Sequence, residues 1–469
     1  MMKGRFKTNH NFYEEAALNE AQLGALFGAT KRQTRDLIKT LFNGVTEYTT
    51  KKQTLEYIRI FGFNHKDAIQ RQSITDDEQL ILKLYSKRIG DEDKYIVQTG
   101  LYAGVIYIHN VEISITSAYG DTFLKRMLNS LSHVMVDNTQ LSGVSSKQPN
   151  EFENIIAYLF VQSLEWSGVL GLPQRYQLKH QHSHKVRGKV DVNQYLKRCI
   201  PFTGKLTTSY REQQYEQIII DVLYLACRTL EKKMGRHFLN KVAGIYQQLA
   251  IHFSGRWPSV NAIKQVTQQS SLAHPMYQSY KQTLAYAVLI LTEKSAELSK
   301  DAEQVEVKGY LFDIAQLFEM YLESILSHYL PDWLVSSQQK LTVYQGTFFE
   351  RNMYPDLVLT HIVTGQVMVF DAKFKRMRWD YRDLDRADFY QIHTYMAYYP
   401  QQLKVGGLLY PCDRPVEFGQ CYANPVMGQT TDGGTHFIVD GVYVNDEMSM
   451  SDIIESEVEM VRRIKSLLD

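Results

Sequence analysis

Two short apolar runs in the C-terminal third of the chain predict a β-hairpin. The runs Leu357–Leu359 and Val367–Phe370 are rich in β-branched residues, and the pair Thr364-Gly365 between them is typical of a turn. We therefore expect two antiparallel strands joined by a two-residue turn.

That turn would set a register in which charged residues meet at the open end of the hairpin. Asp356 would face Lys373, and Val358 would face Asp371. Because facing residues share one side of a sheet, as do residues two apart on a strand, Asp356, Asp371 and Lys373 should converge on one face. Burying two carboxylates and an ammonium group there is unfavourable unless they pair or hold a metal ion.

Helical and alternating apolar patterns divide the rest of the chain into further elements. Alternation predicts strands at Tyr95–Ser117 and Val405–Tyr410 and a further hairpin at His436–Val444. Helical spacing predicts helices at Asp121–Val136, Glu151–Gly168, Gln213–Glu231, Lys241–Ser254, Met276–Ala296, Tyr310–Leu330, Ala387–Tyr398 and Asp452–Leu468. We expect a mixed α/β protein (α+β), with a β-rich N-terminal region and a C-terminal mixed sheet flanked by helices.

The length of 469 residues and a hydrophobic fraction of 44% allow two or three domains. We divide the chain into a helical segment over residues 1–90, a β-rich and helical segment over 91–300, and a third domain over 301–469. The first segment is a candidate contact for DNA or a partner. Residues 137–150 are polar and lack periodicity, which is typical of a linker or loop.

The segment Ala21–Phe42 resembles a helix-turn-helix, because its helical pattern is interrupted at Gly28-Ala29-Thr30. Four basic residues would lie on its second helix: Lys31, Arg32, Arg35 and Lys39. A DNA-binding helix and an ordinary solvated charged face both produce this pattern.

Composition narrows the possible environment and partners. The formal net charge of +1 gives no global basic signature, so any contact with nucleic acid must come from local patches. The four cysteines lack CxxC spacing, which argues against a disulfide framework and a zinc site. No apolar run resembles a membrane helix or a signal peptide, so we expect a cytoplasmic protein.

Three histidines alternate in a basic segment at His180, His182 and His184. Alternate histidines on a strand can bind a metal, but no Cys, Asp or Glu completes a ligand set nearby in the sequence. A basic arm that contacts phosphate or an acidic partner explains the segment as well.

The hairpin has the groups that metal-dependent phosphodiester hydrolysis requires. Mg²⁺ usually takes one or two protein carboxylates, and Asp356 and Asp371 match that number. Lys373 could orient the attacking water or stabilise the transition-state charge. The alternative is a buried Asp–Lys–Asp ion network with no catalytic role.

Neighbouring helices add three candidates to this site. Glu319 and Glu323 lie one turn apart on the helix before the hairpin, and we favour Glu319 as a third metal ligand. Gln391 and Tyr395 lie four residues apart on the helix after it, where they could hydrogen-bond substrate or align the lysine of the hairpin.

The segment that follows the hairpin is a candidate for binding DNA phosphates. Four of its basic residues are the predicted contacts: Lys375, Arg376, Arg378 and Arg382. Trp379 and Tyr381 are interleaved with them, as in phosphate-tracking loops. A solvated loop with internal ion pairs is the alternative.

These motifs together resemble a known nuclease superfamily. The pattern of Pro355-Asp356, a hairpin and Asp371-Ala372-Lys373, with a helical glutamate upstream, resembles the PD-(D/E)XK superfamily, and the trailing QxxxY resembles its RecB-like branch. Over residues 95–411, the order YAGVIYIHNVEISI, GLPQRY, RGKVDV, LFEMYLESIL and VFDAKFK resembles the McrC family of McrBC-type restriction systems and the related LlaJI-type subunits. A proline-lysine pair usual in that family is replaced here by Thr116-Ser117.

The resemblance implies a PD-(D/E)XK core and a Mg²⁺-dependent endonuclease subunit that cuts double-stranded DNA. It also implies a partner, a hexameric AAA+ GTPase ring of the McrB type, into which a β-rich stalk inserts. The segments 95–116 and 179–198 are candidates for that contact. The chain has no GxxxxGK[ST] loop of its own. A stand-alone repair nuclease and a non-catalytic GTPase-activating scaffold remain alternatives.

Overall fold

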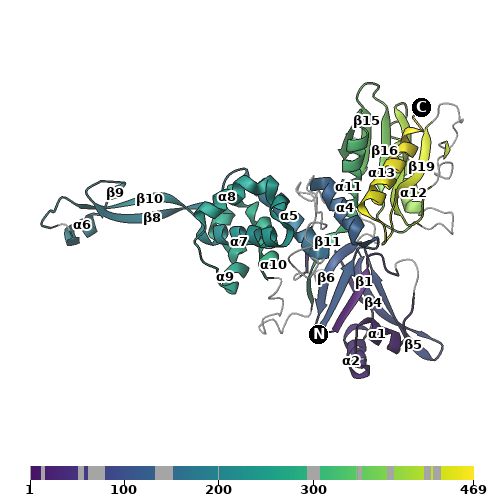
Figure 1. The fold of residues 1–469 in the computed structure, drawn as a ribbon, viewed down its shortest axis with the longest axis horizontal. Coiled ribbons are helices and arrows are strands. Elements are labelled where there is room, and N and C mark those ends of the chain that lie inside the picture. Colours follow the sequence, from purple (N-terminus) through teal and green to yellow (C-terminus); the bar gives the residue numbers. More distant parts are fainter. Residues whose placement is uncertain are drawn as a thin grey trace. The chain divides into compact units, whose positions relative to one another are not determined.

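The computed structural model of the chain describes most of its residues. They are residues 2–11, 16–50, 58–61, 80–132, 151–198, 200–292, 307–344, 346, 351–377, 385–416, 424–425 and 435–468. The chain forms two compact units (Figure 1), the first made of residues 1–133 and 299–469 and the second of residues 134–298.

The first unit begins with a β-rich module. One sheet has the order β1 (Met2–Lys7), β7 (Val111–Thr116), β6 (Tyr102–Ile108), β11 (Val307–Asp313) and β3 (Ile58–Phe61). A second sheet contains β2 (Thr46–Thr49), β4 (Leu80–Ile89) and β5 (Glu92–Thr99). Helices α1 (Glu20–Leu26) and α2 (Lys31–Leu41) share an apolar core with these strands. The strands predicted from Tyr95 onward are confirmed as β5, β6 and β7.

The units do not follow the predicted boundary after residue 90. Strands β4 and β5 pair across that point, with Ile89 opposite Glu92. Strand β11, which follows the second unit in the sequence, pairs with β6, which precedes it. The N-terminal segment, the early strands and residues 299–469 therefore form one unit, into which the second unit is inserted.

The other module of the first unit is built on a six-stranded mixed sheet. Its order is β12 (Trp333–Ser337), β15 (Leu357–His361), β16 (Val367–Ala372), β17 (Leu403–Cys412), β19 (His436–Tyr443) and β18 (Asn424–Pro425). Strands β16, β17 and β19 are parallel, whereas β15 is antiparallel to β16. Four helices and a two-stranded ladder complete the module: α4 (Gly120–Ser132), α11 (Ile314–Tyr329), α12 (Arg386–Met396), α13 (Met450–Lys465), β13 (Leu341–Tyr344) and β14 (Arg351–Met353).

The predicted hairpin is present as β15 and β16, but the predicted two-residue turn is wrong. Leu357 pairs with Phe370, and the amide of His361 donates to the carbonyl of Gln366 at 2.8 Å, so the loop contains four residues. The register is thus shifted by two residues, and Asp356 lies across from Asp371 rather than Lys373. Because side chains alternate with a period of two, this shift leaves every side chain on its predicted face.

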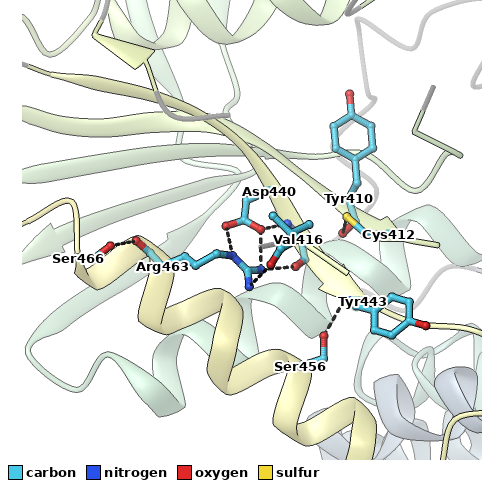
Figure 2. A network of polar contacts seen from close by, with 9 residues as sticks. Tyr410, Cys412, Val416, Asp440, Tyr443, Ser456, Arg463 and Ser466 are labelled. Atoms are coloured by element: carbon cyan, nitrogen blue, oxygen red, sulfur yellow. Dashed lines mark hydrogen bonds and ion pairs between the residues drawn. The ribbon is translucent and has the colours of Figure 1, made fainter. Parts of the chain in front are cut away.

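Helices from distant parts of the sequence are joined by one buried carboxylate. Glu457 of α13 accepts hydrogen bonds from Arg126 of α4 at 2.7 and 2.6 Å and from Tyr321 of α11 at 2.6 Å. A second buried pair, Asp440 of β19 with Arg463 of α13, holds α13 to the sheet (Figure 2). The sheet and its helices therefore share charged as well as apolar contacts.

The second unit combines a helical body with a long hairpin. The helices are α5 (Glu151–Gly168), α7 (Gln217–Met234), α8 (Ala243–His252), α9 (Val260–Lys264) and α10 (Tyr280–Thr292), with short 3-10 turns at Arg236–Val242, Val266–Gln268, Ser270–Ala273 and Pro275–Tyr277. Strands β8 (Gln174–Ser183) and β10 (Leu206–Tyr215) extend from these helices (Figure 1), with β9 (Lys189–Val190) and α6 (Val192–Arg198) near their far end. The helix predicted from Gln213 begins at Gln217 instead, because the preceding residues pair in β10.

Two of the alternating histidines, His180 and His182, lie on β8, and His184 directly follows this strand. His182 Nδ1 is 2.9 Å from the hydroxyl of Thr207, and His184 Nδ1 is 2.9 Å from the carbonyl of Gly204. Across the described part of the chain, no group of three His, Cys, Asp or Glu side chains is arranged to hold a metal. None of the described helices is both long and apolar enough to cross a membrane.

Candidate active site

The predicted catalytic residues gather at the end of β16. Asp356 immediately precedes β15, and Asp371 and Lys373 lie at the end of β16, where the backbone amide of Lys373 still donates to Leu409 of β17 at 2.9 Å. Helix α12 supplies Gln391. The sheet register and one helix therefore bring together residues that lie up to 35 positions apart in the sequence.

Asp371 and Lys373 form a buried ion pair. Their side chains are almost fully removed from solvent, with relative exposures of 1% for Asp371 and 9% for Lys373, and Lys373 Nζ lies 2.8 Å from Asp371 Oδ2. The other oxygen, Oδ1, is buried and has no hydrogen-bond partner among the described residues. An unpartnered buried carboxylate oxygen is costly, which makes it a fitting position for a cation.

Lys373 also contacts helix α12. Its Nζ donates to Gln391 Oε1 at 3.3 Å, and Gln391 Nε2 donates to the hydroxyl of Tyr395 at 2.9 Å. Burial raises the pKa of Tyr395 to about 12, so its phenol stays protonated at neutral pH. The two residues predicted from the QxxxY spacing thus form a chain of hydrogen bonds that ends on the lysine.

A further acidic residue, Asp388, belongs to the site and was not among the predicted residues. It is buried, with one oxygen 3.5 Å from Lys373 Nζ and the other 2.5 Å from Lys375 Nζ. Asp388, Gln391 and Tyr395 follow an i, i+3, i+7 pattern and therefore share one face of α12. This spacing is the feature of the sequence from which Asp388 could have been predicted as a site residue.

Asp356 is held in an environment that disfavours its charge. Its Oδ2 accepts a hydrogen bond from the amide of Ala372 at 2.9 Å. Burial raises the pKa of Asp356 well above its usual value, and the negative charges of Asp371 and Glu319 raise it further, whereas Lys373 opposes the shift. A nearby cation would reduce the electrostatic repulsion among these three acidic groups.

Glu319 lies close enough to influence the pKa of Asp356. It sits on α11, where its Oε2 accepts a hydrogen bond from Gln338 Nε2 at 3.3 Å, and it contributes to the raised pKa of Asp356. Within the described ranges, however, no three such side chains form a ready-made metal-binding group. The role of Glu319 as a third ligand therefore remains a prediction.

The donor set nevertheless fits Mg²⁺. Asp356 and Asp371 face each other on one side of the sheet, and both provide hard oxygen ligands. Two carboxylates with open positions for water and substrate oxygens are typical of Mg²⁺ sites. The unpartnered Oδ1 of Asp371 points to the same conclusion.

The predicted DNA-binding residues have different surroundings. Lys375 is paired with Asp388, so its charge is partly neutralised within the protein. Arg376 is 70% exposed, and its Nε lies 3.1 Å from Asp413. Arg378 and Arg382 lie outside the described residues.

The sequence profile of the family described as "McrBC 5-methylcytosine restriction system component" matches residues 97–411, more than half of the chain. The chain belongs to the McrBC family. The predicted resemblance to an McrC-type subunit of a restriction system is thereby confirmed at the level of the family.

Two solved structures are similar to this McrBC-family chain. The first is the refined half-complex from a tetradecameric assembly of Thermococcus gammatolerans McrB AAA+ hexamers with bound McrC, with 14% identity and a TM-score of 0.46 over 98% of this chain and 100% of the other. The second is the cryo-EM structure of the Thermococcus gammatolerans McrBC complex, with 16% identity and a TM-score of 0.29 over 70% of this chain and 88% of the other. The search of curated proteins finds none that matches this chain.

Proposed function

We propose that this McrBC-family chain is the Mg²⁺-dependent DNA endonuclease subunit of a GTP-driven restriction complex. One observation carries the proposal: Asp371 forms an ion pair with Lys373 at 2.8 Å, retains an unpartnered buried oxygen, and lies across from a second carboxylate, Asp356. Two carboxylates and a cation on one face of a mixed sheet are the groups that phosphodiester hydrolysis needs. The alternative of a purely structural ion network would leave no reason for the unpartnered oxygen.

Each residue has a task that follows from its contacts. A bound Mg²⁺ would lower the pKa of a water and neutralise charge on the scissile phosphate. Asp356 and Asp371 would hold this ion. Lys373 is positioned to orient the attacking water or to stabilise negative charge in the transition state. Gln391 holds the lysine from the side of α12.

We also propose that a separate AAA+ GTPase drives the complex. The sequence has no GxxxxGK[ST] loop, so nucleotide hydrolysis would have to come from another chain. This proposal agrees with the membership of the chain in a restriction-system family. The McrC of Thermococcus gammatolerans is bound to McrB AAA+ hexamers in its own assembly.

The hairpin of the second unit is the better of the two candidate partner contacts. Strand β6, within the candidate segment 95–116, is almost entirely buried in its module, so few of its side chains are accessible to a partner. Near the end of the β8–β10 hairpin, by contrast, large apolar side chains are exposed, including Leu196 at 57% and Phe202 at 61%. Exposed apolar residues next to basic ones are typical of interaction surfaces.

The decisive experiment combines the chain with its AAA+ partner, GTP, Mg²⁺ and both methylated and unmethylated DNA. We expect Asp371→Ala and Lys373→Ala to reduce cutting by roughly 10²–10⁴-fold while stimulation of GTP hydrolysis is retained. The control is Asp446→Ala, which removes a half-exposed carboxylate of the same unit. Cutting that survives both substitutions would show that the site is wrong.

Two further outcomes separate the alternatives. Mg²⁺-dependent cutting by the chain alone, without the partner or GTP, would identify a stand-alone nuclease. Stimulation of GTP hydrolysis without any cutting by the unaltered complex, on either DNA, would identify a non-catalytic scaffold.

A further inference from the structure

Helices α1 and α2 form a compact helix-turn-helix at the start of the chain. Helix α1 ends at Leu26 and α2 begins at Lys31, so the turn has four residues. Gly28 in this turn has φ of +58°, a conformation that favours glycine. The amide of Thr30 donates to the side chain of Gln33 at 2.9 Å and fixes the start of α2.

Close packing sets the angle between the two helices. A Cβ atom at Gly24 would lie only 2.6 Å from the hydroxyl of Thr34, so the helices approach more closely there than a larger residue would permit. Leu23, Phe27 and Leu37 are fully or almost fully buried in the core of the module. One side of α2 is therefore committed to the fold, and the opposite side faces solvent.

The solvent-facing side of α2 is strongly basic. Its exposed residues are Lys31, Arg32, Gln33, Arg35, Asp36, Lys39 and Thr40. Glu20 of α1 lies 3.6 Å from Arg35 Nε, but both side chains remain well exposed, at 44% and 67%. Four cations against two acids leave this face with net positive charge.

Part of this arrangement of charges is unfavourable for the helix itself. Lys31 and Arg32 occupy the first turn of α2, where the helix dipole favours acidic residues, and the first turn contains no acid. Lys31, Arg35 and Lys39 follow each other at intervals of four residues, a spacing at which like charges repel. An external polyanion would relieve both effects.

We propose that the exposed side of α2 binds duplex DNA, as a second DNA contact in addition to the candidate nuclease centre. In a helix-turn-helix the second helix enters the major groove while basic residues contact the phosphates. The exposed side contains no large apolar residue, whereas interfaces between proteins centre on aromatic and apolar anchors. The inference rests on the proposed function only in taking DNA as the natural ligand.

The test measures binding without cleavage. The full chain is titrated against a fluorescent 30-base-pair duplex of random sequence in EDTA, at several KCl concentrations, and Arg32→Gln/Arg35→Gln is compared with the unaltered chain. Loss of two phosphate contacts should lower the slope of log Kd against log salt by about 1.8 and weaken binding at least ~10-fold at low salt. The matched control is Lys87→Gln/Arg88→Gln, which removes two exposed positive charges from β4 of the same unit and should leave the slope almost unchanged.

A second variant separates binding from folding. Arg32→Lys/Arg35→Lys retains the charge and should keep the salt slope near that of the unaltered chain. An unchanged slope in the glutamine variant, or an equal loss in the control, would overturn the proposal. So would normal DNA binding combined with weaker binding to the AAA+ partner, since α2 would then contact an acidic protein surface.

DNA binding in EDTA and DNA cleavage by the complex test the α2 contact and the nuclease centre independently. Asp371→Ala should bind the duplex as tightly as the unaltered chain in EDTA, because the α2 contact does not use the nuclease centre. If the complex never cuts DNA but the glutamine variant still loses the salt-dependent binding, the α2 contact stands and the nuclease assignment fails.

Discussion

The substitution Asp440→Asn tests how the sheet that carries the candidate site is held from its other face. Asp440 is fully buried and Arg463 is 4% exposed. The guanidinium donates to Asp440 Oδ2 at 2.9 Å through Nε and to Oδ1 at 2.7 Å through Nη2 (Figure 2). Asparagine keeps the shape of the side chain but removes the charge that balances Arg463.

The expected loss of stability depends on the hydrogen-bond acceptors that the Arg463 guanidinium would retain. Arg463 would keep two carbonyl acceptors, Val416 at 3.0 Å and Gly441 at 3.2 Å, and neither is ionised. Removing one partner of a buried ion pair costs about 3–5 kcal/mol, because the other charge stays buried. With an unfolding entropy of ~2.1 cal/mol/K per residue over a unit of roughly 300 residues, the melting temperature should fall by about 5–8 °C.

The assay is thermal and urea unfolding followed by circular dichroism, with Asp446→Asn as the control. Asp446 pairs with Lys7, and both side chains are 53% exposed. Exposed pairs contribute about 0–1 kcal/mol, so the control should melt within ~2 °C of the unaltered protein. A loss at Asp440 no greater than that of the control would refute the view that this pair holds α13 to the sheet.

Three further predictions concern the site and its sheet. Asp388→Asn should reduce cutting by about 10–100-fold without preventing folding, because it loosens Lys373, and single-turnover cleavage would detect the loss. Glu319→Gln should lower the cleavage rate at least ~10-fold, whereas Glu323→Gln, one turn along α11, should cut normally; equal rates would exclude Glu319 from the site. Gly407→Ala should cost roughly 1–3 kcal/mol in urea unfolding, because its Cβ would lie 2.0 Å from the backbone oxygen of Ile438. The neighbouring Gly406→Ala meets only the flexible side chain of Met396, so its smaller loss provides the comparison.

The location of the candidate site could be predicted from the sequence because it depends on periodicity. Two short apolar runs identified the strands, and the predicted pairing differs from the observed register by two residues, an even number. An even shift keeps Asp356 and Asp371 on the same face. The prediction that these two residues lie close together is therefore correct even though the predicted turn is wrong. An odd shift would have placed them on opposite faces.

Asp388 and the division into units depend on contacts that no local pattern encodes. Asp388 meets Lys373 and Lys375 only because α12 packs beside the end of β16, a placement set by tertiary structure. Likewise, β11 joins the N-terminal sheet after an insertion of about 160 residues. Local propensity and spacing do not specify pairings over such distances.

The six-stranded sheet carries the candidate site on one face and the Asp440–Arg463 ion pair on the other. Ala372, Leu409 and Asp440 lie side by side across β16, β17 and β19, in the row next to Asp371. Asp440 therefore lies on the opposite face from Asp371 and fixes α13 there through Arg463. On the near face, α12 holds Lys373 through Gln391 and Asp388. Because catalytic groups must stay within a fraction of an ångström of their working positions, a sheet held by charged contacts on both faces is a suitable support for them.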